Sequence, residues 1–411
     1  MRTIKPRYLV LPLAAALLVT ACGSSGDKSS SSSPSSGSGA ASTAPAPTGT
    51  PVKIMTIVVP DLFDEAPAGV QAAIQVINAN GGIKDAAGVG HPVEFEKCED
   101  TDANAAADCG RKAVSDKVLA VLGNTAADGD AYMSVTDPAG IPVIPVSANS
   151  AKENTSEFSF PITGGAVVSL LSEVQFLSNQ GVKKWSLVHA ASSTIDFLAK
   201  LMIDKGTQLG MELVNDIQPD INATDITTYA AQLTQNGSEG ALLIDNSSGV
   251  SKYITALDAS GVDLSKFTVA GSLSSPDLEK LGSKADGFYA MTYAFPPTAS
   301  DNAGIQKFND EYNQVKDAPK PTDYAVTAWT SMHAVADLLQ GVPTIDSATL
   351  VSKVKTAPEM SPPQAASWNW GAGPLAIAPG LPLRTFSKQI LVLQVKDGKF
   401  EVFGNGLQEL L

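Results

Sequence analysis

The chain is poor in the residues that build metal centres. It has three cysteines and three histidines among 411 residues, and the histidines, His91, His189 and His333, are scattered. No phosphate-binding glycine loop occurs, and neither does a G-x-S-x-G or H-E-x-x-H motif. The sequence therefore predicts no metal, no cofactor and no enzymatic activity.

Basic side chains are also scarce. The 28 Lys and Arg residues face 42 Asp and Glu, so the formal net charge at pH 7 is −14. An acidic excess of this size opposes binding to nucleic acid and to anionic membrane surfaces. It suits an exported, soluble protein.

Apolar runs of membrane-spanning length are missing, and the one notable run lies at the N-terminus. Three basic residues precede the apolar stretch Tyr8 to Val19, which is too short to span a bilayer comfortably. This pattern is typical of a secretory signal peptide over residues 1–21. Its end, Leu18-Val19-Thr20-Ala21-Cys22, resembles a bacterial lipobox, which implies a lipid on Cys22. The alternative is an ordinary signal peptide with an incidental cysteine.

Residues 22–50 cannot bury a core, because they are rich in Ser and Gly and then in Ala and Pro. We expect them to form a disordered tether that holds the protein body outside the cytoplasm, at a membrane surface in the cell envelope. Two cysteines remain beyond the tether, Cys98 and Cys109. In an oxidising compartment such a pair is most simply a disulfide. Two buried thiols and half of a metal site are the alternatives.

The body alternates strand and helix patterns, which predicts parallel sheets covered by helices. The first series has strands at 52–59, 93–96, 118–122 and 140–145 and helices at 66–78 and 104–115. The second has strands at 184–189, 211–214, 241–245, 267–270 and 287–293 and helices at 195–206, 228–235 and 249–259. Two such series predict an α/β fold with two doubly wound, Rossmann-like lobes and a ligand cleft between them.

Four segments carry a resemblance to a known family. They are Gly69 to Asp85 (GVQAAIQVINANGGIKD), Cys98 to Asn124, Asp137 to Ser150 (DPAGIPVIPVSANS) and Asp323 to Leu339 (DYAVTAWTSMHAVADLL). In this order they resemble type I periplasmic binding proteins of the branched-chain amino-acid group. The resemblance implies a three-strand hinge between lobe one, 52–163 plus 298–357, and lobe two, 164–297 plus 358–411. It also implies a small-molecule ligand and, as partners, the permease and ATPase subunits of an ABC importer.

The ligand loops of lobe one follow predicted strands. By the resemblance, Ser147 and Asn149 take ligand-binding positions. Asn124 and Thr125, in the loop before them, are also candidate ligand residues, with an ordinary turn or N-cap role as the alternative. Phe63 and Tyr293, near strand ends, are expected to form walls of the pocket. Ala127 stands where the family has a serine hydroxyl, which weakens the clamp for an amino-acid carboxylate.

Lobe two departs further from the family. Its candidate ligand residues are Ser193, Thr194, Asn246, Ser272 and Tyr293. The family often has an acid and a tyrosine in the loop after the strand at 184–189, and this chain has neither there. No acid lies near Ser272, where the family's ammonium partner is expected. Asp245 could substitute, although an Asp at a strand end more often caps a helix. The predicted site is polar and largely uncharged, so an acid or a neutral polar ligand is favoured over leucine or valine.

The function predicted is that of a lipid-anchored solute-binding protein that captures a small polar ligand, amino-acid-like, an amide or a small acid. The alternative is a ligand-sensing subunit that regulates a membrane receptor. An envelope hydrolase is a third possibility, for which His189, Ser192 and Asp196 are close in sequence, but a catalytic triad is defined by geometry rather than spacing.

Overall fold

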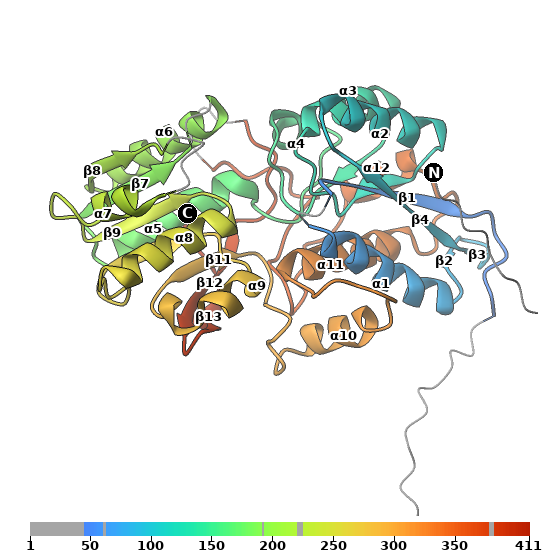
Figure 1. Ribbon diagram of the computed structural model, residues 1–411. Helices are drawn as coiled ribbons and strands as arrows, with labels where there is room; N and C mark the ends of the chain where they lie inside the picture. The colour runs from blue at the N-terminus through green and yellow to red at the C-terminus, as the bar shows by residue number, and fades with distance from the viewer. Residues whose placement is uncertain (1–44, 61–62, 191–192, 220–224, 378–381) are drawn as a thin grey trace, which may run out of the picture. The chain divides into compact units, whose positions relative to one another are not determined.

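The computed structural model describes residues 45–60, 63–190, 193–219, 225–377 and 382–411. The predicted signal peptide, Cys22 and most of the predicted tether lie outside these residues. Within them the chain forms two main β-sheets, each covered by helices (Figure 1). The predicted α/β fold with parallel-sheet lobes is confirmed.

The first sheet is parallel and has the strand order β4-β1-β5-β6. Its strands are β1 (Val52–Val58), β4 (Val93–Glu99), β5 (Ala120–Leu122) and β6 (Val143–Ile144). Around it lie α1 (Glu65–Ala79), α2 (Ala103–Ser115), α3 (Gly129–Thr136) and α4 (Ala151–Thr155), and β2 (Ile83–Lys84) pairs with β3 (Gly90–His91) in a small ribbon. The central strand β1 is buried from Ile54 onward, as its run of apolar residues predicts.

Three helices from late in the chain complete this lobe. They are α10 (Ala303–Tyr312), α11 (Asp323–Leu339) and α12 (Ser347–Val354). Helix α11 packs closely along α1 because Gly69 has no side chain, and a Cβ there would lie 2.3 Å from the carbonyl oxygen of Ala325. The hydroxyl of Ser347 joins α12 to the start of β5 by donating to the carbonyl of Leu119 at 2.9 Å.

The second sheet has seven strands in the order β13-β12-β11-β10-β9-β7-β8. Five are parallel: β7 (Lys184–His189), β8 (Glu212–Ile217), β9 (Gly240–Ile244), β10 (Thr268–Gly271) and β11 (Tyr289–Thr292). The last two, β12 (Gln389–Lys396) and β13 (Lys399–Glu409), are antiparallel to them. The sequence patterns predicted the five parallel strands but not this C-terminal hairpin.

Helices cover both faces of the second sheet. They are α5 (Gly165–Asn179), α6 (Ser193–Gln208), α7 (Thr227–Gln232), α8 (Ser247–Ala259) and α9 (Ser275–Leu281). Successive residues of a strand point to opposite faces. Leu242 of β9 therefore joins the core under α5 and α6, while Leu243 joins the core under α8 and α9.

The chain passes between the two sheets three times. It leaves the first lobe between β6 and β7, returns between β11 and α10, and leaves again between α12 and β12. Each lobe is therefore assembled from segments that are far apart in the sequence. The residue at which each crossing begins stays a prediction.

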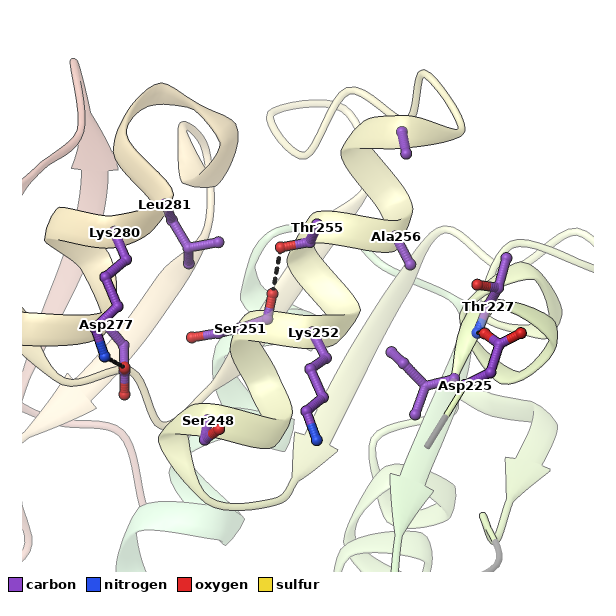
Figure 2. Close-up of a pocket in the computed structure, with 12 residues that line it drawn as sticks. Asp225, Thr227, Ser248, Ser251, Lys252, Thr255, Ala256, Asp277, Lys280 and Leu281 are labelled. Carbon is purple, nitrogen blue, oxygen red and sulfur yellow. Dashed lines mark hydrogen bonds and ion pairs between the residues drawn. The ribbon is translucent and has the colours of Figure 1, made fainter. Parts of the chain in front are cut away.

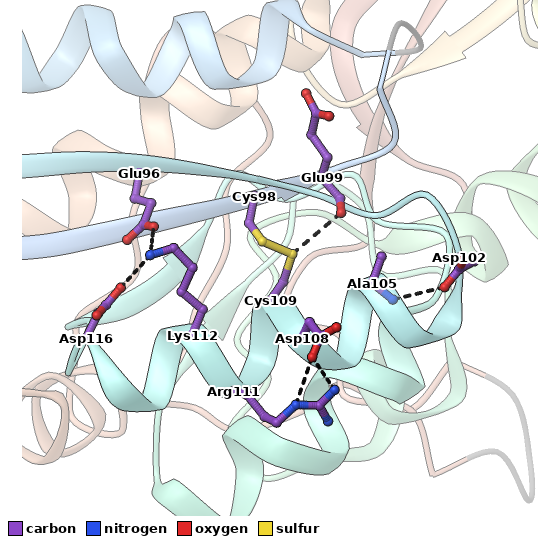
Figure 3. Close-up of a disulfide and its surroundings, with 10 residues drawn as sticks. All are labelled: Glu96, Cys98, Glu99, Asp102, Ala105, Asp108, Cys109, Arg111, Lys112 and Asp116. Carbon is purple, nitrogen blue, oxygen red and sulfur yellow. Dashed lines mark hydrogen bonds and ion pairs between the residues drawn. A yellow bond between two sulfur atoms is a disulfide. The ribbon is translucent and has the colours of Figure 1, made fainter.

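The predicted disulfide between Cys98 and Cys109 is present (Figure 3). It joins β4 to α2 across a Cα–Cα distance of 5.8 Å. Asp102 caps α2 by accepting hydrogen bonds from the backbone N–H groups of Asn104 and Ala105. In the described part of the chain, no helix has the length and apolar character needed to cross a membrane.

Candidate functional site

The strand orders locate the places where a ligand fits best. In the first sheet the chain runs from β1 outward to β4 and then returns past β1 to β5. In the second it runs from β7 to β8 and then to β9 on the other side. Ligands of open α/β sheets bind beyond the carboxyl ends of the strands at such reversals. The loops after β1, β5, β7 and β9 therefore define the candidate site.

The loop after β5 begins at Gly123, whose φ of +70° favours glycine and whose Cβ would lie 2.6 Å from Val70. Asn124 and Thr125 follow, and both are buried. The amide N–H of Thr125 donates to the carbonyl of Ile57, 3.0 Å away. The Oγ1 of Thr125 and the Oδ1 of Asn124 are buried without a hydrogen-bond partner. Unpaired polar atoms of this kind are costly unless a ligand or water pairs with them.

The side-chain amide of Asn124 is occupied within the protein. Its Nδ2 donates to the hydroxyl of Tyr132 at 2.8 Å and to Oε1 of Glu153 at 2.9 Å. Tyr132 also donates to the same Glu153 oxygen, 2.6 Å away. Asn124 therefore ties its loop to α3 and α4, and only its Oδ1 remains available to a ligand.

Glu153 also organises the loop after β6. Its Oε2 accepts hydrogen bonds from the backbone N–H groups of Asn149 and Ser150, both at 3.0 Å. The hydroxyl of Ser150 accepts in return from the N–H of Glu153, which completes a capping box at the start of α4. Burial raises the pKa of Glu153, although its hydrogen bonds oppose this shift.

Sequence reasoning missed Glu153, although Ser150-Ala151-Lys152-Glu153 matches the capping-box pattern. The loop that Glu153 holds carries two predicted ligand residues. Ser147 is half-buried and its Oγ lies 3.3 Å from Oδ1 of Asn149, which is exposed. Both side chains are at least partly exposed and form one hydrogen bond with each other.

The predicted residues of lobe two lie at strand ends and helix starts. Asn246 caps α8 by accepting from the N–H of Gly249 at 3.0 Å, and Ser272 is exposed in the loop after β10. Ser193 and Thr194 are the first residues of α6. Asp245, the candidate ammonium partner, is exposed and accepts from the N–H of Asn246 at 2.7 Å. Asn246 and Asp245 therefore both make local helix-start contacts.

Aromatic residues gather where β11, α1 and α11 meet. The ring of Phe63 stacks on Tyr324 with a centroid separation of 4.8 Å. The hydroxyl of Tyr293 donates to the carbonyl of Gly165 at 2.5 Å, at the start of α5. Thr292 donates through its hydroxyl to the carboxyl group of Asp323, the first residue of α11. The two predicted wall residues, Phe63 and Tyr293, thus both adjoin the start of α11.

Three carboxyl groups lie on the helices that adjoin this cluster, and of the three Glu173 is buried while Glu65 and Asp323 are half-buried. Burial raises the pKa of Glu65, of Asp323 and, to about 8, of Glu173 on α5. Glu173 is 3% exposed and its Oε2 has no hydrogen-bond partner. The carboxyl groups of Glu173 and Asp323 both help to raise the pKa of Tyr293, whereas those of Asp323 and Glu65 act on Tyr324. Sequence reasoning did not bring these acids into the site.

Of the residues considered for hydrolysis, His189 is buried and lies between two exposed carboxyl groups. Nε2 of His189 lies 3.0 Å from Oδ1 of Asp216, and its Nδ1 lies 3.7 Å from Oδ1 of Asp196. Ser192 lies outside the described residues. Over the described ranges, no group of three or more His, Cys, Asp or Glu side chains could hold a metal ion.

A separate groove of about 620 Å³ lies along α8, between α7 and α9 (Figure 2). Its lining residues are Asp225, Ile226, Thr227, Ser248, Ser251, Lys252, Thr255, Ala256, Ala259, Asp277, Lys280 and Leu281. Lys280 pairs there with Asp277 at 2.9 Å. None of the predicted ligand residues lines this groove, which runs beside the helices rather than across the strand ends.

A family model described as "Periplasmic binding protein" matches residues 59–398, which is most of the chain. The chain belongs to the periplasmic binding protein family. Members of this family bind ligands rather than catalyse reactions. A comparison with curated proteins found no match.

Several solved structures share the fold of this periplasmic binding protein. The branched-chain amino acid transporter substrate-binding protein LivJ from Streptococcus pneumoniae, in complex with isoleucine, is 19% identical with a TM-score of 0.68, and the alignment covers 86% of this chain and 99% of that one. A solute-binding protein of an ABC transporter from R. palustris, in complex with benzoate, is 16% identical with a TM-score of 0.68, covering 87% and 96%. An extracellular ligand-binding receptor from Verminephrobacter eiseniae is 16% identical with a TM-score of 0.71, covering 86% and 100%.

We expect Glu153→Gln to loosen the loop after β6. Glutamine offers one acceptor oxygen, so two of the four donors around Glu153 lose their partner, at a cost of about 3 kcal/mol in the free energy of unfolding. Hydrogen exchange at the Asn149 and Ser150 amides should accelerate, while exchange in β1 stays slow. Tyr132→Phe is the milder control, because it removes one donor at a cost of about 1 kcal/mol. Unchanged exchange at both amides in Glu153→Gln would contradict the assignment.

We expect Glu173 to make the protein less stable as the pH rises. Its pKa is about 8 in the folded protein against an ordinary 4.5. Between these values the unfolded chain releases the proton while the folded protein keeps it, so the free energy of unfolding falls. Glu173→Gln removes this loss. The free energy of unfolding of Glu173→Gln should exceed that of the parent protein only slightly near pH 4.5 and by about 4 kcal/mol at pH 8. A shift of one pKa unit corresponds to ~1.4 kcal/mol.

Denaturant unfolding at both pH values measures this difference. Glu359→Gln is the matched control, because Glu359 is exposed and the same substitution there removes no buried carboxyl group. Equal pH dependence in Glu173→Gln and the parent would show that Glu173 is not a neutral carboxyl group in the folded protein.

Proposed function

We propose that this periplasmic binding protein is the lipid-anchored solute-binding component of an ABC importer. The observation that carries the proposal is the family match over residues 59–398, on a fold whose two sheets each have a strand-order reversal. The ABC transporter proteins among its structural neighbours support the same role. The partners would be a permease and an ATPase in the membrane.

The ligand would lie at the carboxyl ends of β1, β5, β7 and β9, between lobes that follow the predicted boundaries. Thr125, Ser147 and Asn149 would offer hydrogen bonds from the first lobe, with Phe63 as a wall. Ser193, Thr194, Asn246, Ser272 and Tyr293 would close over it from the second. A small polar ligand, amino-acid-like, an amide or a small acid, fits hydroxyl and amide groups of this kind.

The anchor follows from the N-terminal sequence. Lipid on Cys22 would hold the body outside the cytoplasm on a tether of nearly thirty residues.

A screen by thermal unfolding tests the ligand-binding role. Amino acids, amides, amines and small acids are added to the purified protein, and a true ligand at a hundred times its Kd stabilises the folded state by about 2.7 kcal/mol. We expect a melting-temperature rise of several degrees for at least one class, and calorimetry to show no submicromolar binding of leucine, isoleucine or valine.

The double variant Ser147→Ala/Asn149→Ala should show no ligand-induced rise in melting temperature. It removes side-chain contacts but keeps the loop in place, because Glu153 holds Asn149 through its backbone N–H. A screen in which no compound changes the melting temperature would count against solute capture. Submicromolar leucine binding that Asp245→Asn removes would instead relocate the ammonium contact to Asp245.

We expect Cys22→Ser to move the protein from the membrane fraction to the soluble fraction while its ligand affinity stays unchanged. The lipid is attached through the thiol, and the serine variant has none. Fractionation of cells that express each form measures the change. A serine variant that stays with the membrane would contradict the lipoprotein assignment.

A further inference from the structure

Two acidic side chains of the first lobe bind the chain's own backbone at the edge of the sheet where a ligand is expected. The first is Asp100, which follows β4 directly and is 2% exposed. Its N–H donates to the carbonyl of Val58 at the end of β1, 2.8 Å away. Its Oδ2 accepts from the backbone N–H groups of Ala127 and Asp128, both at 2.8 Å. Asp100 therefore fills the pair of N–H groups that ends the loop after β5.

The loop after β6 repeats this arrangement, and it adjoins the first loop because β5 and β6 are paired strands. The second acid, Glu153, is buried, and its Oε2 accepts from the N–H groups of Asn149 and Ser150, both at 3.0 Å. Its Oε1 accepts from the side-chain amide of Asn124 at 2.9 Å. Each of two neighbouring loops thus has a consecutive pair of backbone N–H groups that is filled by a carboxylate of the protein itself.

Filled N–H pairs change which ligand groups these loops can hold. Consecutive backbone N–H groups that point to one place are ready binding sites for an anion, and ligands of open α/β sheets bind at this edge. An N–H group that already donates to a buried carboxylate cannot donate to a ligand carboxylate without leaving the first one unpaired. The local field is also negative, since burial and the charges of Asp100 and Asp102 raise the pKa of Asp128. A ligand carboxylate is therefore disfavoured here.

Hydrogen-bond acceptors remain at the same loops. Within the described part of the chain, Oδ1 of Asp100 and Oδ1 of Asn124 are buried and have no hydrogen-bond partner. A carboxylate oxygen and an amide oxygen accept hydrogen bonds and donate none. Oγ1 of Thr125 is also buried without a partner, and a hydroxyl can do both. The hydrogen-bonding balance of the loop after β5 thus favours a ligand that donates over one that only accepts.

We propose that Asp100 and Glu153 are specificity-determining residues that act as built-in carboxylates, so that the site rejects ligand carboxylates and selects a neutral ligand that donates hydrogen bonds, such as a primary amide or a urea. This inference rests on the proposed solute-binding function and narrows its ligand class. It excludes the small acids and the amino acids that the hydroxyl and amide side chains of the site would also accommodate.

Calorimetry on the full chain with two matched pairs of probes tests the ligand class. The pairs are benzamide with benzoate and acetamide with acetate, and the members of each pair differ in having an amide or a carboxylate. We expect the amide of at least one pair to bind about tenfold more tightly than its acid, which is the effect of one hydrogen bond to a charged group. An acid that binds as tightly as its amide, or no binding by any of the four probes, would overturn the ligand class. The wider melting-temperature screen decides separately whether the protein captures a solute.

The variant Asp100→Ala tests the role of the built-in carboxylate. It frees the N–H groups of Ala127 and Asp128, so we expect the affinity for benzoate to rise about tenfold. Asp100→Asn is the matched control, because its amide oxygen can still accept from both groups and should prevent this gain. Folded Asp100→Ala that binds benzoate no better than the parent would overturn the role of Asp100. An equal gain in Asp100→Asn would also overturn it, by showing that charge alone excludes the acid.

A second control uses another aspartate with the same local role. Asp102 also accepts from two backbone N–H groups, at the start of α2, but it is exposed (Figure 3). Asp102→Ala should therefore leave the affinity for benzoate unchanged. A gain equal to that of Asp100→Ala would show that removal of any nearby acid has this effect, and would overturn the specific role of Asp100.

Nuclear magnetic resonance of the parent protein keeps the test independent of whether Asp100→Ala folds. When sodium formate replaces sodium chloride, the amide signals of Ala127, Asp128, Asn149 and Ser150 should stay in place, because internal carboxylates already pair with these groups. In Asp100→Ala, formate should shift the signals of Ala127 and Asp128 and raise the melting temperature more than in the parent, because it replaces the missing carboxylate. Formate-induced shifts of these four signals in the parent would overturn the inference.

Discussion

The carboxyl ends of parallel strands all meet at one edge of a sheet, and the candidate site depends on this constraint. Strands β1 and β5 are neighbours in the first sheet although about sixty residues separate them in the sequence. The shared edge of the sheet therefore brings the loops that follow them together. The same geometry in the second sheet places the ends of β7 and β9 side by side. Ligand contacts can then vary from loop to loop while the sheets keep the positions fixed.

Two buried glutamates illustrate how differently the protein uses the same side chain. Glu153 satisfies both carboxyl oxygens with donors from α3, the loop after β5 and the loop after β6. It acts as a fixed support, because moving any one of these elements would leave a buried donor unpaired. Glu173 has no such donors, so the folded protein keeps it largely protonated at neutral pH. A buried carboxyl group without hydrogen-bond donors lowers the stability of the folded protein unless another group pairs with it.

The crossings between the lobes bring the acids into the aromatic cluster. Thr292, at the end of β11, contacts Asp323 at the start of α11, although α10 lies between them in the sequence. Tyr293 and Gly165 meet across an even longer separation. The segments that join the lobes thus also bring together polar groups from distant parts of the chain.

The sequence alone determined the order of strands and helices, because short apolar runs and helical spacing are local patterns that follow from burial. It also indicated the pairing of Cys98 with Cys109 and, through four ordered segments, the family. It missed the hairpin of β12 and β13, whose antiparallel pairing depends on the exposed edge of β11 rather than on local pattern. Only the tertiary structure showed that Asn124 turns its amide toward Glu153, that Thr292 contacts Asp323, and that Tyr293 contacts Gly165. These contacts depend on which side chains are buried and on which residues from different lobes meet. Neither property can be inferred from the spacing of residues along the chain.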